Sequence, residues 1–213
     1  MERKFSAGLV ARMAEGSGVP ESSVRSHFRA LRDAGMTTSG RRGRSAPDMT
    51  TLDGLRLALA LAASDDAASA PKRVQEIEAL PLLRQEAPIM DLYFLDRQSC
   101  KFRDSMEAVI ERVRDLEADM GPIRPDLMIE VERQRAQVFV NRHGTLSADA
   151  TFAQTNEFIE AEFMGGARPI RKLEHPAGGL EVSARFGWAT IDAILDATIT
   201  RPGFDLDAMI GQD

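Results

Sequence analysis

The stretch that most constrains the fold is TLDGLRLALALAA, at residues 51–63. Its leucines surround most of a helix instead of lying on one stripe; they are Leu52, Leu55, Leu57, Leu59 and Leu61. Thr50 and Asp53 have the spacing of a capping box, which predicts a helix start at this point. A helix that is apolar on most sides must be buried on more than one side. The rest of the chain therefore has to supply elements that pack around residues 51–63.

Two shorter amphipathic helices are predicted before this central one. The first runs from residue 6 to the glycines at 16–18, and its apolar residues have helical spacing. The second begins after Pro20 and stops at Gly35. Its apolar residues recur at i, i+4 and i+7 and are Val24, Phe28 and Leu31. A short Gly-containing turn thus separates two amphipathic helices.

The remaining chain is predicted to combine helices with antiparallel strands. Helical patterns cover 71–87, with a break at Pro81, then 105–120 and 189–199. Alternating patterns predict two strands within 127–140 and a hairpin over 169–188. The ambiguous segment 145–164 is interpreted as a helix from about residue 148 to residue 164.

A linker is predicted at residues 64–71, because DDAASAP is small, polar and ends in proline. A chain of 213 residues is long enough for two small domains. We therefore expect one domain at 1–63 and another at 72–213.

Charge is distributed unevenly between these two parts. Residues 1–63 contain 10 Lys or Arg and 6 Asp or Glu, although the whole chain has a formal net charge of -6. Distant acidic groups are screened at physiological salt, where the Debye length is about 8 Å. A locally basic module on an acidic body can therefore still bind a polyanion.

The basic residues of the N-terminal part follow a pattern that suits DNA. With the apolar stripe of 21–33 facing inward, Ser22, Ser26 and Arg29 face outward, and Ser23, Arg25 and Arg32 lie beside them. The second helix of a helix-turn-helix fits the major groove, where arginine pairs with guanine and short hydroxyls approach closely. The next segment, TTSGRRGRSAP, carries Arg41, Arg42 and Arg44 and is predicted to be an exposed loop that contacts phosphates or the minor groove.

The stretch GVPESSVRSHFRALRDAGM resembles the turn and recognition helix of winged helix-turn-helix DNA-binding proteins of bacteria and their phages. The resemblance covers roughly the first quarter to third of the chain, with helix 51–63 completing a three-helix core. It implies that the loop arginines form the wing and that the groove-facing residues are Ser22, Ser23, Arg25, Ser26 and Arg29. The expected fold class is α+β: an N-terminal, mostly helical (winged) helix-turn-helix domain and a C-terminal α+β domain with antiparallel hairpins.

An enzyme is not supported by the residues. The three histidines, His27, His143 and His175, are far apart, and no HExxH, phosphate-binding or nucleophile-elbow motif occurs. Glu157 and Glu160 could share a helix face, but such pairs are usually solvated. We expect no catalytic residues, no metal and no cofactor, and the single Cys100 excludes an intrachain disulfide framework.

The sequence therefore predicts a sequence-specific, double-stranded DNA-binding protein, most simply a transcriptional regulator of bacterial or phage origin. Residues 72–213 would join copies into a homo-oligomer, with a dimer favoured, and no residue set marks an effector site. A cytoplasmic location is expected, without membrane contact, because no apolar run reaches membrane length. Two alternatives stay open: a phage DNA-packaging subunit similar to small terminases, and a non-enzymatic adaptor whose basic loop docks on an acidic protein.

Overall fold

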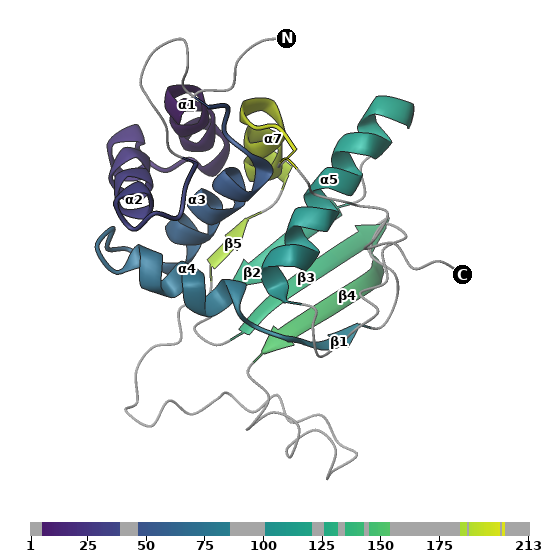
Figure 1. Ribbon diagram of the computed structural model, residues 1–213. Helices are drawn as coiled ribbons and strands as arrows, with labels where there is room; N and C mark the ends of the chain where they lie inside the picture. Colours follow the sequence, from purple (N-terminus) through teal and green to yellow (C-terminus); the bar gives the residue numbers. More distant parts are fainter. Residues whose placement is uncertain are drawn as a thin grey trace, which may run out of the picture.

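In the computed structural model, the described helices are grouped around α3, with strands beside them (Figure 1). The ranges described are 6–38, 47–85, 101–120, 126–131, 135–142, 145–153, 184–186, 188–200 and 202. Within the described part of the chain, no helix is long and apolar enough to cross a membrane.

The three helices expected near the N-terminus are confirmed as α1 (Ser6–Ser17), α2 (Glu21–Asp33) and α3 (Thr51–Ala63). Gly18 and Gly35 follow α1 and α2 with φ of 70° and 71°, a region that glycine adopts without steric cost. The apolar stripe of α2 is buried as expected. The capping box of Thr50 and Asp53 is present at the start of α3.

Helix α3 occupies the centre of the helical group, which confirms that it is buried on several sides. It contacts α1, α2, α4, α5 and α7. Leu55, Leu57 and Leu59 are fully buried although they point in different directions around the helix. One continuous apolar cluster extends from Leu9 in α1 to Ala197 at the end of α7.

The predicted linker leads into a packed helix. Asp66 accepts hydrogen bonds from the backbone N–H groups of Ala68 and Ser69, at 3.1 and 3.2 Å, and so forms a turn. Helix α4 (Ala70–Glu78) then packs on α3. The predicted break at Pro81 is confirmed, but the residues after it form strand β1 (Leu82–Gln85) instead of continuing as a helix.

Two further predicted helices are confirmed as α5 (Phe102–Met120) and α7 (Trp188–Ala197). Helix α5 lies over one face of the strands (Figure 1). Helix α7, the last helix of the chain, lies beside α1, the first. The Arg114 guanidinium of α5 donates to the carbonyl oxygens of Leu195 and Thr198, at 3.2 and 3.4 Å. This contact satisfies carbonyls at the C-terminal end of α7, where a cation is favourable.

The strands pair in the order β1-β4-β3-β2-β5, and every pairing is antiparallel. The two strands expected within 127–140 are confirmed as β2 (Asp126–Val131) and β3 (Arg135–Arg142). The helix expected from residue 148 is wrong for residues 148–153, which belong to strand β4 (Thr145–Ala153). Of the hairpin expected at 169–188, residues 169–183 lie outside the described ranges, and β5 (Ala184–Phe186) pairs with β2.

The expected fold class, α+β with antiparallel hairpins in the C-terminal part, is wrong, because the described residues are mainly helical. Their six helices contain more than twice as many residues as the strands. The physical reason is that α5 and α7 bury their apolar sides together with α3, so helix packing and not hairpin formation organises the described core.

Candidate nucleic-acid interface

The turn between α1 and α2 is fixed by local hydrogen bonds. The Ser17 hydroxyl donates to the Met13 carbonyl oxygen at 2.6 Å, and the Gly18 N–H donates to the Ala14 carbonyl oxygen at 3.0 Å. Helix α2 then starts directly after Pro20, whose missing N–H costs nothing at a helix start. The result is a helix, a short turn and a second helix, both packed on α3.

The outer face of α2 carries all six residues that the sequence predicted for it. Five of them are exposed, and only Ser23 is half-buried; the exposed five are Ser22, Arg25, Ser26, Arg29 and Arg32. Placing these residues on one side of α2 is a direct consequence of burying Val24, Phe28 and Leu31 on the other.

These exposed side chains differ in whether their polar groups form hydrogen bonds or ion pairs within the protein. Arg25 pairs with Glu21, Arg32 pairs with Asp33 at 3.2 Å, and the Ser26 hydroxyl donates to the Ser22 carbonyl oxygen at 2.9 Å. Arg29 has neither a hydrogen bond nor an ion pair with any residue in the described ranges. Its five N–H donors are therefore available to a partner.

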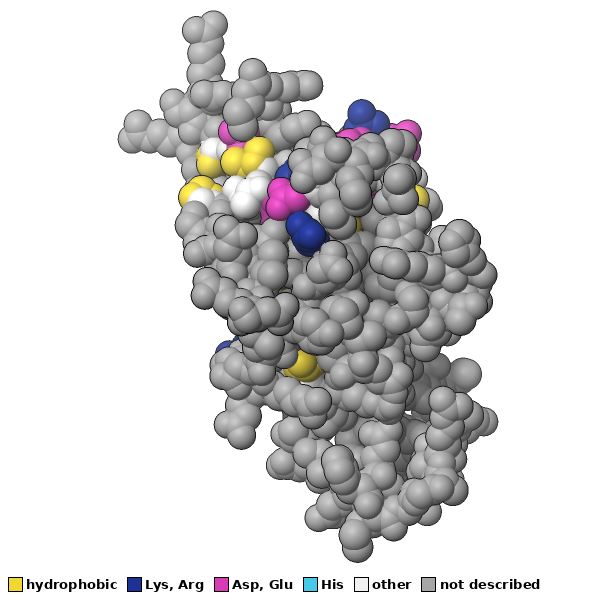
Figure 2. Space-filling model, turned by 90° about the vertical axis from the view of Figure 1, so that its right-hand side faces the viewer, with side chains coloured by type: hydrophobic (Ala, Val, Ile, Leu, Met, Phe, Trp, Pro, Cys, Tyr) yellow, Lys and Arg dark blue, Asp and Glu magenta, His cyan; other side chains and the backbone are white. Residues whose placement is uncertain are grey.

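Three arginines of α2 gather along one shallow groove. Arg25, Arg29 and Arg32 line it together with Val10 of α1 and Phe28 of α2. Their aliphatic stems can cover apolar surface while the charged groups stay in solvent. On the face shown in Figure 2, turned away from α2, the described side chains also include acidic and basic groups that lie beside one another, as Arg25 and Glu21 do on α2.

The inner side of α2 is held by a histidine whose role the sequence did not reveal. His27 is buried, with Nδ1 2.9 Å from the Ser23 carbonyl oxygen and Nε2 3.0 Å from the Ser64 carbonyl oxygen. Because Ser64 caps the C-terminal end of α3, this ring connects the two helices. A lone histidine with no paired ligand gives no sequence signal for such a contact.

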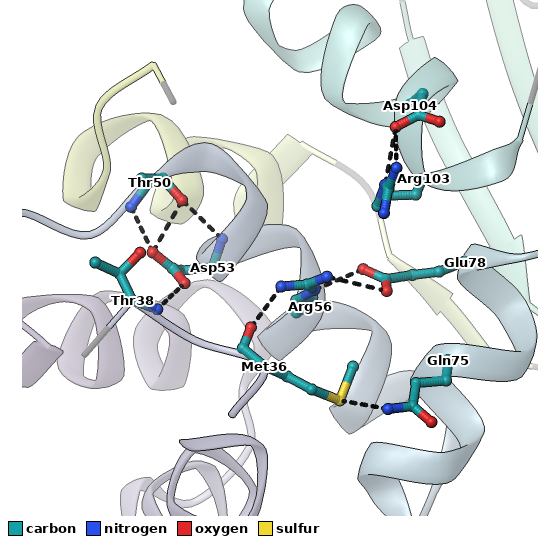
Figure 3. Close-up of polar contacts among 9 residues, drawn as sticks. All are labelled: Met36, Thr38, Thr50, Asp53, Arg56, Gln75, Glu78, Arg103 and Asp104. Atoms are coloured by element: carbon teal, nitrogen blue, oxygen red, sulfur yellow. Dashed lines mark hydrogen bonds and ion pairs between the residues drawn. The ribbon is translucent and has the colours of Figure 1, made fainter. Parts of the chain in front are cut away.

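The exit of α2 is attached to α3 and α4 by one arginine (Figure 3). Arg56 Nη1 donates to the Met36 carbonyl oxygen at 2.6 Å. The same guanidinium binds the Glu78 carboxylate through Nε and Nη2, at 2.7 and 3.3 Å. The side chains of Arg56 and Glu78 are only 18% and 9% exposed, so this ion pair is largely withdrawn from water.

Asp53 binds the backbone on both sides of the basic segment, defined here as residues 39–49. Its Oδ1 accepts from the Thr38 N–H at 2.7 Å, and its Oδ2 accepts from the Thr50 N–H and hydroxyl at 2.7 and 2.9 Å (Figure 3). The basic segment includes the predicted wing residues, which lie outside the described ranges; they are Arg41, Arg42 and Arg44. The structure thus brings together six of the nine predicted residues and shows where the segment carrying the other three is attached.

A separate charged pair lies at the start of α5 and does not join the α2 surface. Burial alone would lower the pKa of Arg103, but the hydrogen bond and charge of Asp104, with smaller contributions from Glu78 and Glu107, raise it. Arg103 therefore keeps its charge. Among the described side chains, no group of three His, Cys, Asp or Glu residues is placed to hold a metal ion.

Comparisons with models of protein families, with curated proteins and with solved structures found no match for this chain. The interpretation of the α2 surface therefore depends on its geometry and charge.

Proposed function

We propose that this protein binds double-stranded DNA sequence-specifically through the outer face of α2 and acts as a transcriptional regulator. The observation that carries the proposal is the exposed Ser and Arg face on the second helix of a helix-turn-helix. In the middle of this face lies the guanidinium of Arg29, which has no hydrogen-bond or ion-pair partner among the described residues. For a regulator of bacterial or phage origin, this proposal places the protein in the cytoplasm, where the DNA of a bacterial cell lies.

The dimensions and chemistry of α2 suit a major groove. Its 13 residues give a rod about 20 Å long, and the groove is about 12 Å wide. Arg29 can donate two hydrogen bonds to O6 and N7 of guanine, and the small side chains of Ser22 and Ser26 allow close approach. Arg25 can exchange Glu21 for a phosphate at little cost, because an exposed pair contributes only about 0–1 kcal/mol.

Replacing Arg29 with alanine should weaken binding to the preferred DNA site by about 1–3 kcal/mol and relax the choice of base at one position, because a bidentate contact to guanine is lost. Arg12→Ala is the matched control, since it removes one exposed arginine from α1 that is paired with Glu15. Competition binding with single-base variants of the site would measure both effects. Equal losses for the two variants would contradict base readout by Arg29.

Replacing Arg41, Arg42 and Arg44 with alanine should reduce the salt dependence of DNA binding, because each lost phosphate contact lowers the slope of log K against log salt by about 0.9. Loss of all three contacts would lower it by about 2.7. Affinity measured by fluorescence anisotropy between 50 and 200 mM salt would give the slope. An unchanged slope would exclude phosphate contacts by these arginines.

A single helix-turn-helix reads few base pairs, and two-fold symmetric dimers commonly extend the site. We therefore expect the protein to act as a homodimer. Light scattering at micromolar concentration should give twice the mass of the 23.4 kDa chain. A stable monomer that binds a single half-site with full affinity would contradict this part of the proposal.

A further inference from the structure

The N-terminal end of α2 carries an acidic side chain beside its serines and arginines. Glu21 is the first residue of α2, and its side chain is 50% exposed. One shallow hollow is lined by Glu21, Ser22, Arg25, Ser26 and Arg29. The hollow therefore brings a carboxylate together with arginines and serines that are proposed to contact DNA.

The Glu21 carboxylate is engaged only in a contact that is easily exchanged. It pairs with Arg25, one turn further along α2, and the side chain of Arg25 is 64% exposed. Exposed pairs of this kind contribute little to stability, because water solvates both groups. The dipole of α2 favours a carboxylate in the first turn of the helix, whichever donor it binds. Glu21 can therefore leave Arg25 when another donor approaches.

A carboxylate that faces DNA is unfavourable unless it finds a hydrogen-bond donor, because the phosphates repel it. In the major groove, guanine presents the acceptors N7 and O6, and thymine presents the acceptor O4. Adenine presents the donor N6 beside the acceptor N7, whereas cytosine presents only the donor N4. A carboxylate at a base edge therefore favours cytosine over the other three bases.

Glu21 lies at the end of α2 where base contacts are expected. In helix-turn-helix complexes the residues near the N-terminus of the second helix contact base edges. Asp33, also acidic and exposed, lies at the opposite end of α2 and pairs with Arg32. Glu21 and Arg29 are eight positions apart, which is about 12 Å along the helix and about four base steps of DNA. The two side chains can therefore act on different bases of one site.

We propose that Glu21 is a specificity-determining residue that accepts a hydrogen bond from N4 of a cytosine in the recognised site. This inference rests on the proposed function, in which α2 binds the major groove. On binding, Arg25 exchanges Glu21 for a phosphate, and Glu21 exchanges Arg25 for the cytosine amino group. Arg29 donates to guanine, so the acidic and the basic side chain select different bases.

The test measures base preference in Glu21→Ala and Glu21→Gln. Competition binding would use the site selected by the natural protein, with each base pair changed in turn to the other three. We expect the natural protein to prefer cytosine by about tenfold at one position, within about four base pairs of the position that Arg29→Ala relaxes. Both variants should lose this preference, because alanine has no acceptor and glutamine can also donate to acceptors on other bases. Since Glu21 is exposed, both variants should fold, and circular dichroism would verify this.

Glu15→Gln is the matched control for the change in charge. Glu15 is exposed on α1 and pairs with Arg12 at 3.2 Å, so this variant loses the same charge from a similar pair. A general electrostatic effect would change the affinity for every duplex by the same factor in each variant. Only Glu21→Gln should change the preference for one base at one position.

Two results would overturn the inference while leaving the proposed function in place, provided that Arg29→Ala still relaxed one position. The first is a cytosine preference that is absent from the selected site or unchanged in both Glu21 variants. The second is an equal change in affinity for all four bases, which would indicate an electrostatic or structural role alone. If the natural protein selected no motif, the proposed function and the inference would both fail.

Discussion

Replacing Glu78 with alanine is expected to lower the free energy of unfolding by about 3–5 kcal/mol, because it leaves the guanidinium of Arg56 poorly hydrated and without its carboxylate. Most of that cost comes from leaving the charge of Arg56 without a partner, and less comes from losing its attraction to Glu78. The same change should loosen the exit of α2, since Arg56 also donates to the Met36 carbonyl oxygen. Urea unfolding followed by circular dichroism would give the change in free energy.

A matched control for Glu78→Ala lies on the same helix. Lys72 and Glu76 form an exposed pair with Nζ 4.0 Å from Oε1, and Lys72 is 83% exposed. Lys72→Ala should therefore change the free energy of unfolding by no more than about 0.5 kcal/mol.

Replacing Arg56 with methionine and Glu78 with leucine in the same variant should lower the free energy of unfolding less than Glu78→Ala alone, because no charge is left unpaired. A loss for Glu78→Ala as small as that for Lys72→Ala would show that the buried pair does not hold α4 to α3.

Replacing Gly16 with alanine is expected to cost about 3 kcal/mol, at the upper end of the usual range for overpacking. A Cβ atom at this position would lie 2.2 Å from the Ala189 carbonyl oxygen and 2.9 Å from its carbonyl carbon. These are backbone atoms of α7, so no side chain can rotate away and the helix itself must shift. Hydrogen exchange should become faster in α7, since α1 is its main neighbour.

Gly8→Ala provides the control within α1. Outside the neighbouring backbone of α1, no described atom lies within 4 Å of a Cβ at Gly8, and alanine is about 1 kcal/mol more favourable than glycine inside a helix. This variant should be as stable as the natural protein or up to about 1 kcal/mol more stable. If Gly16→Ala were equally well tolerated, the close approach of α7 to α1 would be contradicted.

The local features of the helical unit could be predicted from the sequence because their causes are local. The apolar spacing of Val24, Phe28 and Leu31 determines which face of α2 is buried and so which face is exposed. The capping box of Thr50 and Asp53 involves residues three positions apart. For the same reason, the outward position of Arg29 follows from the sequence alone.

Features that depend on distant residues could not be predicted in this way. Residues 148–153 have an ambiguous pattern and were predicted as a helix, but pairing with β3, for example Val138 with Ala150, makes them a strand. The contact between α7 and α1 is another such feature, because their residues lie more than 170 positions apart. The hydrogen bond from the Thr38 N–H to Asp53 was likewise not predicted. The capping box already gave Asp53 a role within its own helix, so nothing in the sequence indicated a second partner.

Selection of random duplex DNA by the purified full-length protein tests the central claim most directly. Bound fragments would be sequenced, and affinity for the enriched site would be measured at two salt concentrations. Specific readout by α2 predicts an enriched motif, two-fold symmetric if the protein is a dimer, in which Arg29→Ala relaxes the choice of base at one position. Salt-sensitive binding without a motif would contradict sequence-specific regulation and favour a packaging or architectural role, and no binding at low salt would contradict DNA binding altogether.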